Sequence, residues 1–347
     1  MLIIYLVVSV ICFYILSIIT EGFFVPSIDK IAKKLRLSSD AAGATLLAMG
    51  SSAPEFFTSV IAVFGIAGSG TADVGSGTIV GSAIFNVLVI VGAAAMFKSV
   101  TLQWKPVIRD QIFYVLTILM LLWAFWDGKI ILIEALSFVL MYSVYVLLAA
   151  NWRKWFKYKD VEVVDSTEDK KGFNASFTNF VGYLIPSVKK KPKYYMVTFL
   201  LSVALIGVIS WVLVEQIIGA SDILKINPIF LSLTVLAAGT SVPDLIGSIV
   251  VAKQGRGDMA VSNAIGSNIF DVLFGLGLPW SLKLLISGGS IAVGKSNLIA
   301  SVILLFATVI AILFMLIIRN WKIGHKSGLF LIVMYVGYCI YIVLKSS

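Results

Sequence analysis

Two six-residue motifs place a carboxylate directly after a proline within apolar sequence. Residues 50–55 read GSSAPE and residues 239–244 read GTSVPD, so the motifs end in Glu55 and Asp244. In a helix, each proline leaves the carbonyl four residues earlier without a backbone donor, close to several hydroxyl groups. Carboxylate, hydroxyl and carbonyl oxygens suit Ca²⁺ and alkali cations, whereas zinc or copper would call for Cys or His. The two motifs therefore predict a cation site.

A second pair of similar motifs adds polar side chains to this site. Residues 81–88 read GSAIFNVL and residues 266–273 read GSNIFDVL. They place Asn86 and Asp271 at equivalent positions, so Asp271 is a third candidate carboxylate. The candidate oxygen ligands are Glu55, Asp244, Asp271, Asn86, Ser51, Ser52, Thr240, Ser241, Ser82, Ser267 and the main-chain carbonyls of Ala48 and Ala237.

The composition shows that membrane-spanning helices must position these residues. Of the 347 residues, 59% are apolar and 13% are charged, against about 25% charged residues in soluble domains. This balance excludes a soluble enzyme, a nucleic-acid binder and a disordered chain. The net charge of +9 is therefore no sign of a nucleic-acid partner. Cys12 and Cys339 both lie in apolar runs, so we expect no disulfide framework.

Ten apolar runs are long enough to cross a bilayer, which takes about 20 helical residues. They are predicted at roughly 1–20, 41–66, 74–97, 108–126, 130–150, 194–219, 227–252, 259–286, 297–318 and 327–345.

The distribution of Lys and Arg predicts the orientation of these spans. With the N-terminus outside, the cytoplasmic loops hold 22 of the 27 basic residues, Arg109 and Arg256 among them, and the outer loops hold 5. Both termini then face outside, and the polar segment 151–193 is a short cytoplasmic loop. We expect an integral multi-pass protein of the plasma (cell) membrane.

The two pairs of motifs reveal an internal repeat. At an offset of 189 residues, seven of nineteen positions in 45–63 and 234–252 are identical. The predicted domains are a first five-helix repeat at 1–150 (motifs 43–92) and a second at 194–347 (motifs 232–280). Five is an odd number, so the second repeat enters the membrane from the opposite side. The predicted fold is therefore an all-α membrane protein of ten transmembrane helices, built as two inverted-topology five-helix repeats with broken helices at the midplane.

The interiors of the predicted spans offer no Lys or Arg to pair with the three carboxylates. Two carboxylates about 4 Å apart repel each other by roughly 4 kcal/mol at an effective dielectric constant near 20. Three of them cannot all stay ionised without bound cations or protons, and ionisable residues inside a membrane are functional candidates. The single histidine, His325, falls in a cytoplasmic loop, where we expect it to be solvated.

Two other classes of membrane protein fit the sequence less well. Residues 255–258 match the GxGD motif of intramembrane aspartyl proteases, but Lys253 and Arg256 place Asp258 at the cytoplasmic surface. No second aspartate in a Tyr-Asp context appears in an earlier span, so we expect no enzyme activity. A passive cation channel needs no inverted pair of broken helices, whereas secondary transporters commonly have one.

The sequence resembles the cation/calcium exchanger superfamily, whose repeats carry motifs similar to GSSAPE and GTSVPD. Within it, the likeness to potassium-dependent sodium/calcium exchangers is greatest. It rests on FFVPSIDKIAKKLRLSSDAAGAT (23–45), GTIVGSAIFN (77–86) and RGDMAVSNAIGSNIFDVLFGLGLPW (256–280).

This resemblance implies roles for the candidate residues. Glu55 and Asp244 would be the central Ca²⁺ and Na⁺ ligands, and Asp271 would carry K⁺ sensitivity. The remaining ligands named above would complete the ion sites. The first and sixth spans would move as a gate against the helices that hold the ions.

We therefore expect an electrogenic antiporter that exchanges Na⁺ for Ca²⁺, with K⁺ co-transported with Ca²⁺, by alternating access. The alternatives are a proton- or Na⁺-coupled exchanger of another divalent cation and a K⁺-independent Na⁺/Ca²⁺ exchanger. We expect no cofactor, and the expected partners are Ca²⁺, Na⁺ and K⁺ ions and the lipid bilayer. The sequence does not indicate an oligomeric state.

Overall fold

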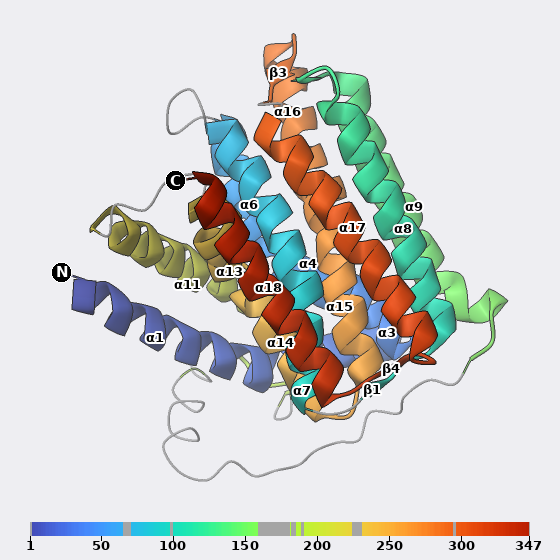
Figure 1. Ribbon diagram of the computed structural model, residues 1–347. Coiled ribbons are helices and arrows are strands. Elements are labelled where there is room, and N and C mark those ends of the chain that lie inside the picture. Colours follow the sequence, from blue (N-terminus) through green and yellow to red (C-terminus); the bar gives the residue numbers. More distant parts are fainter. Residues whose placement is uncertain are drawn as a thin grey trace.

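The computed structural model describes residues 2–64, 71–97, 100–158, 181, 185–188, 191–223, 231–293 and 296–346. Nearly all of the elements in these ranges are helices, and four short strands form two pairs (Figure 1). Labels beginning with η denote π-helices, except for the 3-10 helix η4.

The first half of the chain holds fourteen elements within the described ranges. They are α1 (Leu2–Ile19), η1 (Thr20–Phe24), α2 (Val25–Leu35), α3 (Ser39–Ala42), η2 (Gly43–Leu47), α4 (Ala48–Ser51), α5 (Ala53–Phe64), α6 (Thr71–Phe85), η3 (Asn86–Ile90), α7 (Val91–Phe97), β1 (Val100–Thr101), α8 (Trp104–Phe125), β2 (Lys129–Ile130) and α9 (Leu132–Trp155).

The described elements of the second half follow a similar order. They are η4 (Pro192–Tyr194), α11 (Tyr195–Ile223), η5 (Leu231–Leu236), α13 (Ala237–Thr240), α14 (Val242–Lys253), α15 (Gly257–Phe270), η6 (Asp271–Leu276), α16 (Gly277–Ser287), β3 (Ile291–Ala292), α17 (Ser296–Ile318), β4 (Lys322–Ile323) and α18 (His325–Ser346).

Eight helical segments of the described chain are long and apolar enough to cross a membrane. They correspond to eight of the ten predicted spans. Of the other two, 41–66 and 227–252, the described parts (41–64 and 231–252) are interrupted helices. The first segment is longer than expected and continues to Leu35. Pro26 does not stop it, because the preceding π-helix η1 takes up the irregular hydrogen bonding near the proline.

The two interrupted helices break at equivalent serines, two residues before each proline. Ser52 has φ −83° and ψ 14°, and Ser241 has φ −82° and ψ 5°, so both leave the helical region. Pro54 and Pro243 then occupy the first turn of the next helix, where a missing N–H costs little. These breaks fit the predicted effect of the two prolines, and they explain why neither segment counts as a continuous span.

The halves of the chain pack against each other crosswise through two glycines of the repeated motifs. Helix α6 packs on η5, and α15 packs on η2. A Cβ atom on Gly81 would overlap the carbonyl oxygen of Leu233, and one on Gly266 would overlap that of Ala44. Glycine is therefore required at both positions. It lets each of the two motifs that begin with Gly-Ser (81–88 and 266–273), which we call the GS motifs, contact the interrupted helix of the other half of the chain.

The two strand pairs lie at opposite ends of the molecule (Figure 1). In antiparallel pairing, Val100 of β1 lies opposite Ile323 of β4, and Lys129 of β2 lies opposite Ala292 of β3. Each pair joins loops that charge counting places on one side of the membrane, which agrees with the predicted alternation of these four loops.

The described side chains form two hydrophobic clusters. The larger one fills the bundle of α5–α9 and α15–α18. The smaller one joins α1, η1, α2 and α11 to faces of α14 and α15. In Figure 1, α1 and α11 lie side by side and oblique to the other long helices. We call α1, η1, α2 and α11 the lateral unit and the other helices the main bundle.

Candidate cation site

The carboxylate of Asp244 lies at the centre of a buried ring of donors. Its Oδ1 atom accepts hydrogen bonds from Ser51 Oγ and, at 2.8 Å, from Ser267 Oγ. Its Oδ2 atom accepts from Asn86 Nδ2 at 3.2 Å and from Ser52 Oγ at 3.5 Å. All five side chains are fully buried. Three of the four donors come from the first half of the chain, so the site lies where the halves meet.

Glu55 is bound in a similar way by the second half of the chain. Ser241 Oγ donates to Glu55 Oε1 at 3.1 Å, and the hydroxyls of Ser241 and Ser82 are 2.7 Å apart. Glu55 Oε2 is buried and has no hydrogen-bond partner. Each carboxylate that follows a proline is thus bonded to a serine of the other repeat's motif, which the sequence offset alone could not establish.

Asp271 is buried without any hydrogen bond to its carboxylate oxygens. It is the first residue of the π-helix η6, and the charges of Glu55 and Asp244 both act on it. Among the described residues, no Lys or Arg forms an ion pair with any of these three carboxylates. Buried, unpaired carboxylates are costly unless a cation or a proton neutralises them.

The remaining predicted ligands lie around the same carboxylates. Thr240 Oγ1 donates to the carbonyl oxygen of Ala237 at 3.1 Å, and the amide of Ser241 donates to it at 3.2 Å. The carbonyl oxygen of Ala48 accepts the amide of Ser52 at 3.0 Å. The carbonyl oxygen of Ala237 thus already accepts two hydrogen bonds and would have to release one to bind an ion, whereas the second donor to that of Ala48, Ser51 Oγ, lies at the longer distance of 3.5 Å.

Four buried oxygens of the site lack donors and are candidates for holding cations: Glu55 Oε2, Asn86 Oδ1 and both carboxylate oxygens of Asp271. No three His, Cys, Asp or Glu side chains in the described ranges converge closely enough to hold a metal ion alone. A bound ion would therefore combine these carboxylates with hydroxyl, amide and carbonyl oxygens. Such mixed, flexible oxygen sets are typical of Ca²⁺ sites.

The side chains that orient Asn86 are not among the predicted ligands. Asn268 Oδ1 accepts a hydrogen bond from Asn86 Nδ2 at 2.9 Å. Asn268 Nδ2 in turn donates to Tyr114 Oη at 2.8 Å and to the carbonyl oxygen of Ala83 at 3.0 Å. This series of hydrogen bonds fixes the side-chain nitrogen of Asn86 and leaves its Oδ1 atom without a hydrogen-bond donor. One signal was available, because Asn268 occupies the position that Ala83 holds in the other GS motif.

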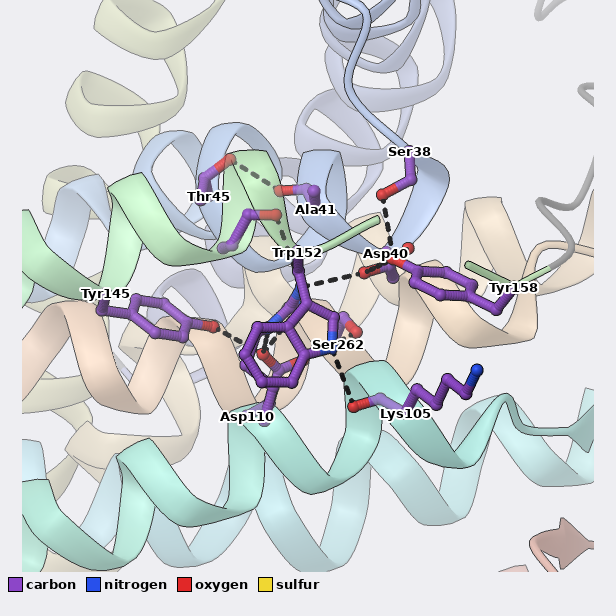
Figure 2. Close-up of polar contacts among 12 residues, drawn as sticks. Ser38, Asp40, Ala41, Thr45, Lys105, Asp110, Tyr145, Trp152, Tyr158 and Ser262 are labelled. Atoms are coloured by element: carbon purple, nitrogen blue, oxygen red, sulfur yellow. Dashed lines mark hydrogen bonds and ion pairs between the residues drawn. The ribbon is translucent and has the colours of Figure 1, made fainter. Parts of the chain in front are cut away.

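Arg109, predicted to lie in a cytoplasmic loop, is instead buried inside the protein. It lies within α8 and is 1% exposed. Its guanidinium pairs with Asp40 at 3.1 Å and with Asp110 at 2.7 Å. Figure 2 shows the surrounding contacts, in which Asp110 accepts hydrogen bonds from Tyr145 and Ser262. Counting basic residues could not predict this cluster, because Asp40 lies 69 positions from Arg109 in the sequence.

His325 lies where the sequence predicts, whereas Tyr158, in the predicted loop 151–193, contacts the main bundle. His325 is exposed at the start of α18, as expected for a solvated histidine. Tyr158 follows the end of α9, and its hydroxyl donates to both carboxylate oxygens of Asp40, at 2.9 and 3.0 Å (Figure 2). Burial and the charge of Asp40 raise the pKa of Tyr158, so its hydroxyl stays protonated. Beyond Tyr158, the predicted loop 151–193 is described only at 181, 185–188 and 191–193.

Comparison with known proteins gives one family-model match, described as sodium/calcium exchanger protein, over residues 5–151 and 194–344. Among curated proteins, the chain is 27% identical to sodium/potassium/calcium exchanger 4 of Mus musculus, covering 93% of this chain and 78% of that protein. It is 29% identical to sodium/potassium/calcium exchanger 5 of Homo sapiens, covering 97% of this chain and 82% of that protein.

Solved structures of the sodium-calcium exchanger NCX_Mj have the same fold. The form soaked without Na⁺ and Ca²⁺ superimposes with a TM-score of 0.67 at 20% identity, covering 98% of each chain. The form soaked with 10 mM Na⁺ and no Ca²⁺ gives a TM-score of 0.66 at 22% identity, covering 97% of this chain and 98% of that one.

Proposed function

Because the chain belongs to the sodium/calcium exchanger protein family, we propose that it is an electrogenic antiporter that exports Ca²⁺, together with K⁺, in exchange for Na⁺. The observation that carries this proposal is the buried set of Glu55, Asp244 and Asp271 at the junction of the two halves, without a basic partner among the described residues. Buried carboxylates with free oxygens are suited to bind and release cations.

Competition for shared ligands would couple the two fluxes. Ca²⁺ and Na⁺ both prefer oxygen ligands, and both would use Glu55 and Asp244 with the surrounding hydroxyl, amide and carbonyl oxygens. The site would therefore hold either Ca²⁺ or Na⁺ at one time. Alternating access would carry each load across the membrane, and the lateral unit would slide against the main bundle.

Charge counting supports K⁺ as a co-transported ion. Three ionised carboxylates carry three negative charges, and Ca²⁺ neutralises two of them. An uncompensated charge in a buried cavity is costly, and K⁺ at Asp271 would complete the compensation. The two mammalian relatives named above are sodium/potassium/calcium exchangers, which also favours this assignment. A protonated Asp271 would achieve the same neutrality without K⁺.

We propose the topology that the basic residues predict. Two inverted five-helix repeats, at 1–150 and 194–347, would place both termini outside and the loop 151–193 in the cytoplasm of the cell. This arrangement places the two strand pairs on opposite sides of the membrane.

Potassium replacement tests the co-transport step. In Na⁺-loaded proteoliposomes we expect ⁴⁵Ca²⁺ uptake to require external K⁺ and to fall sharply when choline replaces it. Asp271→Asn mimics the protonated carboxylate, so this variant should exchange Na⁺ for Ca²⁺ without a response to K⁺. If wild-type uptake is the same in K⁺ and choline, K⁺ is not transported and the protein is a K⁺-independent exchanger.

A further inference from the structure

A three-residue connection (36–38), which we call the joint, links the lateral unit to the interrupted helix that carries ion ligands. Helix α2 of the lateral unit ends at Leu35, and α3 begins at Ser39 and leads through η2 to the GSSAPE motif. Arg36 ends α2 in the left-handed conformation, with φ 55°. Any sliding of α2 against α3 must therefore change the backbone at or near this joint.

A buried arginine of the main bundle contacts both sides of the joint. Arg256 precedes α15 and is 1% exposed. Its Nη2 atom pairs with Asp29 Oδ1 on α2 at 2.7 Å, and its Nε atom lies 3.4 Å from Ser39 Oγ on α3. Its Nη1 atom donates to Gln254 Oε1 at 3.2 Å. One guanidinium thus holds the moving side through Asp29 and the fixed side through Ser39 and Gln254.

The residue after Ser39 is held entirely within the main bundle. Asp40 pairs with Arg109 of α8 at 3.1 Å and accepts hydrogen bonds from Tyr158. The cluster of Arg109, Asp110, Tyr145 and Ser262 then fixes this end of α3 to α8, α9 and α15 (Figure 2). The end of α3 nearest the joint is therefore anchored. Within the described ranges, the Asp29–Arg256 pair is the ion pair between α2 and the main bundle, and it would have to break if α2 moved.

We propose that Asp29 and Arg256 form a latch that holds the lateral unit against the main bundle in the conformation seen here. This inference rests on the proposed function, in which the lateral unit is the part that moves. Separating the two side chains leaves the Arg256 charge buried without its partner, which disfavours the other conformation. The strength of this ion pair would therefore set the relative populations of the two conformations.

The latch can be tested by thiol labelling, which requires no transport. Ala32 lies on the covered face of α2, three residues after Asp29, and is 8% exposed. A reporter is made by Ala32→Cys in a Cys12→Ala, Cys339→Ala background, purified in lipid nanodiscs. We expect Asp29→Asn to raise the rate of maleimide labelling by about tenfold, within the usual range for an energetic coupling of this kind.

Exchanging the two charged residues distinguishes loss of the ion pair from a local disruption of the structure. Arg256→Gln should raise labelling as Asp29→Asn does, while the exchanged pair Asp29→Arg, Arg256→Asp should lower it again toward the parent rate. The control Lys33→Gln, on the exposed face of α2, should leave the rate unchanged. Unchanged labelling in the single variants overturns the latch, and so does equally fast labelling in the exchanged pair.

Failure of the latch and failure of the proposed function give different results. If the parent protein shows no Na⁺-driven Ca²⁺ uptake, exchange is refuted, whatever the labelling rates show. If the parent transports Ca²⁺ but labelling ignores Asp29 and Arg256, only the latch is refuted. Where both hold, Asp29→Asn should change the maximal transport rate more than the Ca²⁺ affinity, because none of the ion ligands is altered.

Discussion

Replacement of Asp244 by Asn removes one negative charge from the centre of the site with almost no change in shape. Asp244 accepts hydrogen bonds from Ser51, Ser267, Asn86 and Ser52. The side-chain nitrogen of the new Asn would face one of these hydrogen-bond donors, and two donors cannot bond to each other. The variant therefore loses both an ionic ligand and part of the hydrogen bonding that positions it.

The size of the effect follows from Coulomb's law. A unit charge about 4 Å from a monovalent ion contributes about 4 kcal/mol at an effective dielectric constant near 20, so the contribution to a divalent ion is about 8 kcal/mol. If the amide dipole and relaxation recover half of that, the loss is about 4 kcal/mol, or roughly a thousandfold in affinity. Asp244→Asn should thus weaken Ca²⁺ binding at least about a thousandfold, and Na⁺ binding by less.

Calorimetric titration of the purified protein with Ca²⁺ measures this loss directly. A matched control is Glu134→Gln, because Glu134 accepts the Ile131 amide at 2.9 Å at the start of α9 and is no part of the site. The control should bind Ca²⁺ like the wild type. Asp244→Asn should still fold, since the removal of an unpaired buried charge offsets the loss of one hydrogen bond. Ca²⁺ affinity within tenfold of wild type in Asp244→Asn would refute the assigned role.

Three further predictions concern packing, the buried arginine and topology. Gly81→Ala should destabilise the protein by about 1–3 kcal/mol or more, since its Cβ would meet Leu233 O, whereas Gly337→Ala has free space; equal melting temperatures would contradict the crosswise packing. Arg109→Gln should cost about 3–5 kcal/mol in unfolding free energy, because two aspartates lose their partner; a loss below about 1 kcal/mol would show that the pair is dispensable. A cysteine introduced by Ser166→Cys, outside the described residues, should not react with impermeant thiol reagents in intact cells. Labelling at this position would show that the loop 151–193 faces outside, against the proposed orientation.

Much of the fold could be predicted from local sequence. Eight predicted spans are long apolar helices, because span length and apolar composition are local properties. The two breaks, at Ser52 and Ser241, follow from the conformational effect of Pro54 and Pro243. The continuation of the first helix past Pro26 was missed, because a π-helix that accommodates a proline has no clear sequence signal.

Contacts between distant residues could not be predicted in the same way. The motifs identified Glu55 and Asp244, but only the packing of the two halves brings Ser241 to Glu55 and Ser51 to Asp244. The pairing of Arg109 with Asp40 joins residues 69 positions apart. Counting basic residues treats an arginine at the edge of an apolar run as solvated, so it cannot recognise one that is neutralised inside the protein.

The central claim is that Na⁺ and Ca²⁺ exchange through the site formed by Glu55 and Asp244. The most direct test is ⁴⁵Ca²⁺ uptake into proteoliposomes with K⁺ outside, comparing an outward Na⁺ gradient with no gradient. We predict rapid uptake by the wild type only with the gradient, and almost none by Glu55→Gln under either condition. Uptake that proceeds equally without Na⁺ inside, or that persists at the wild-type rate in Glu55→Gln, would contradict this account.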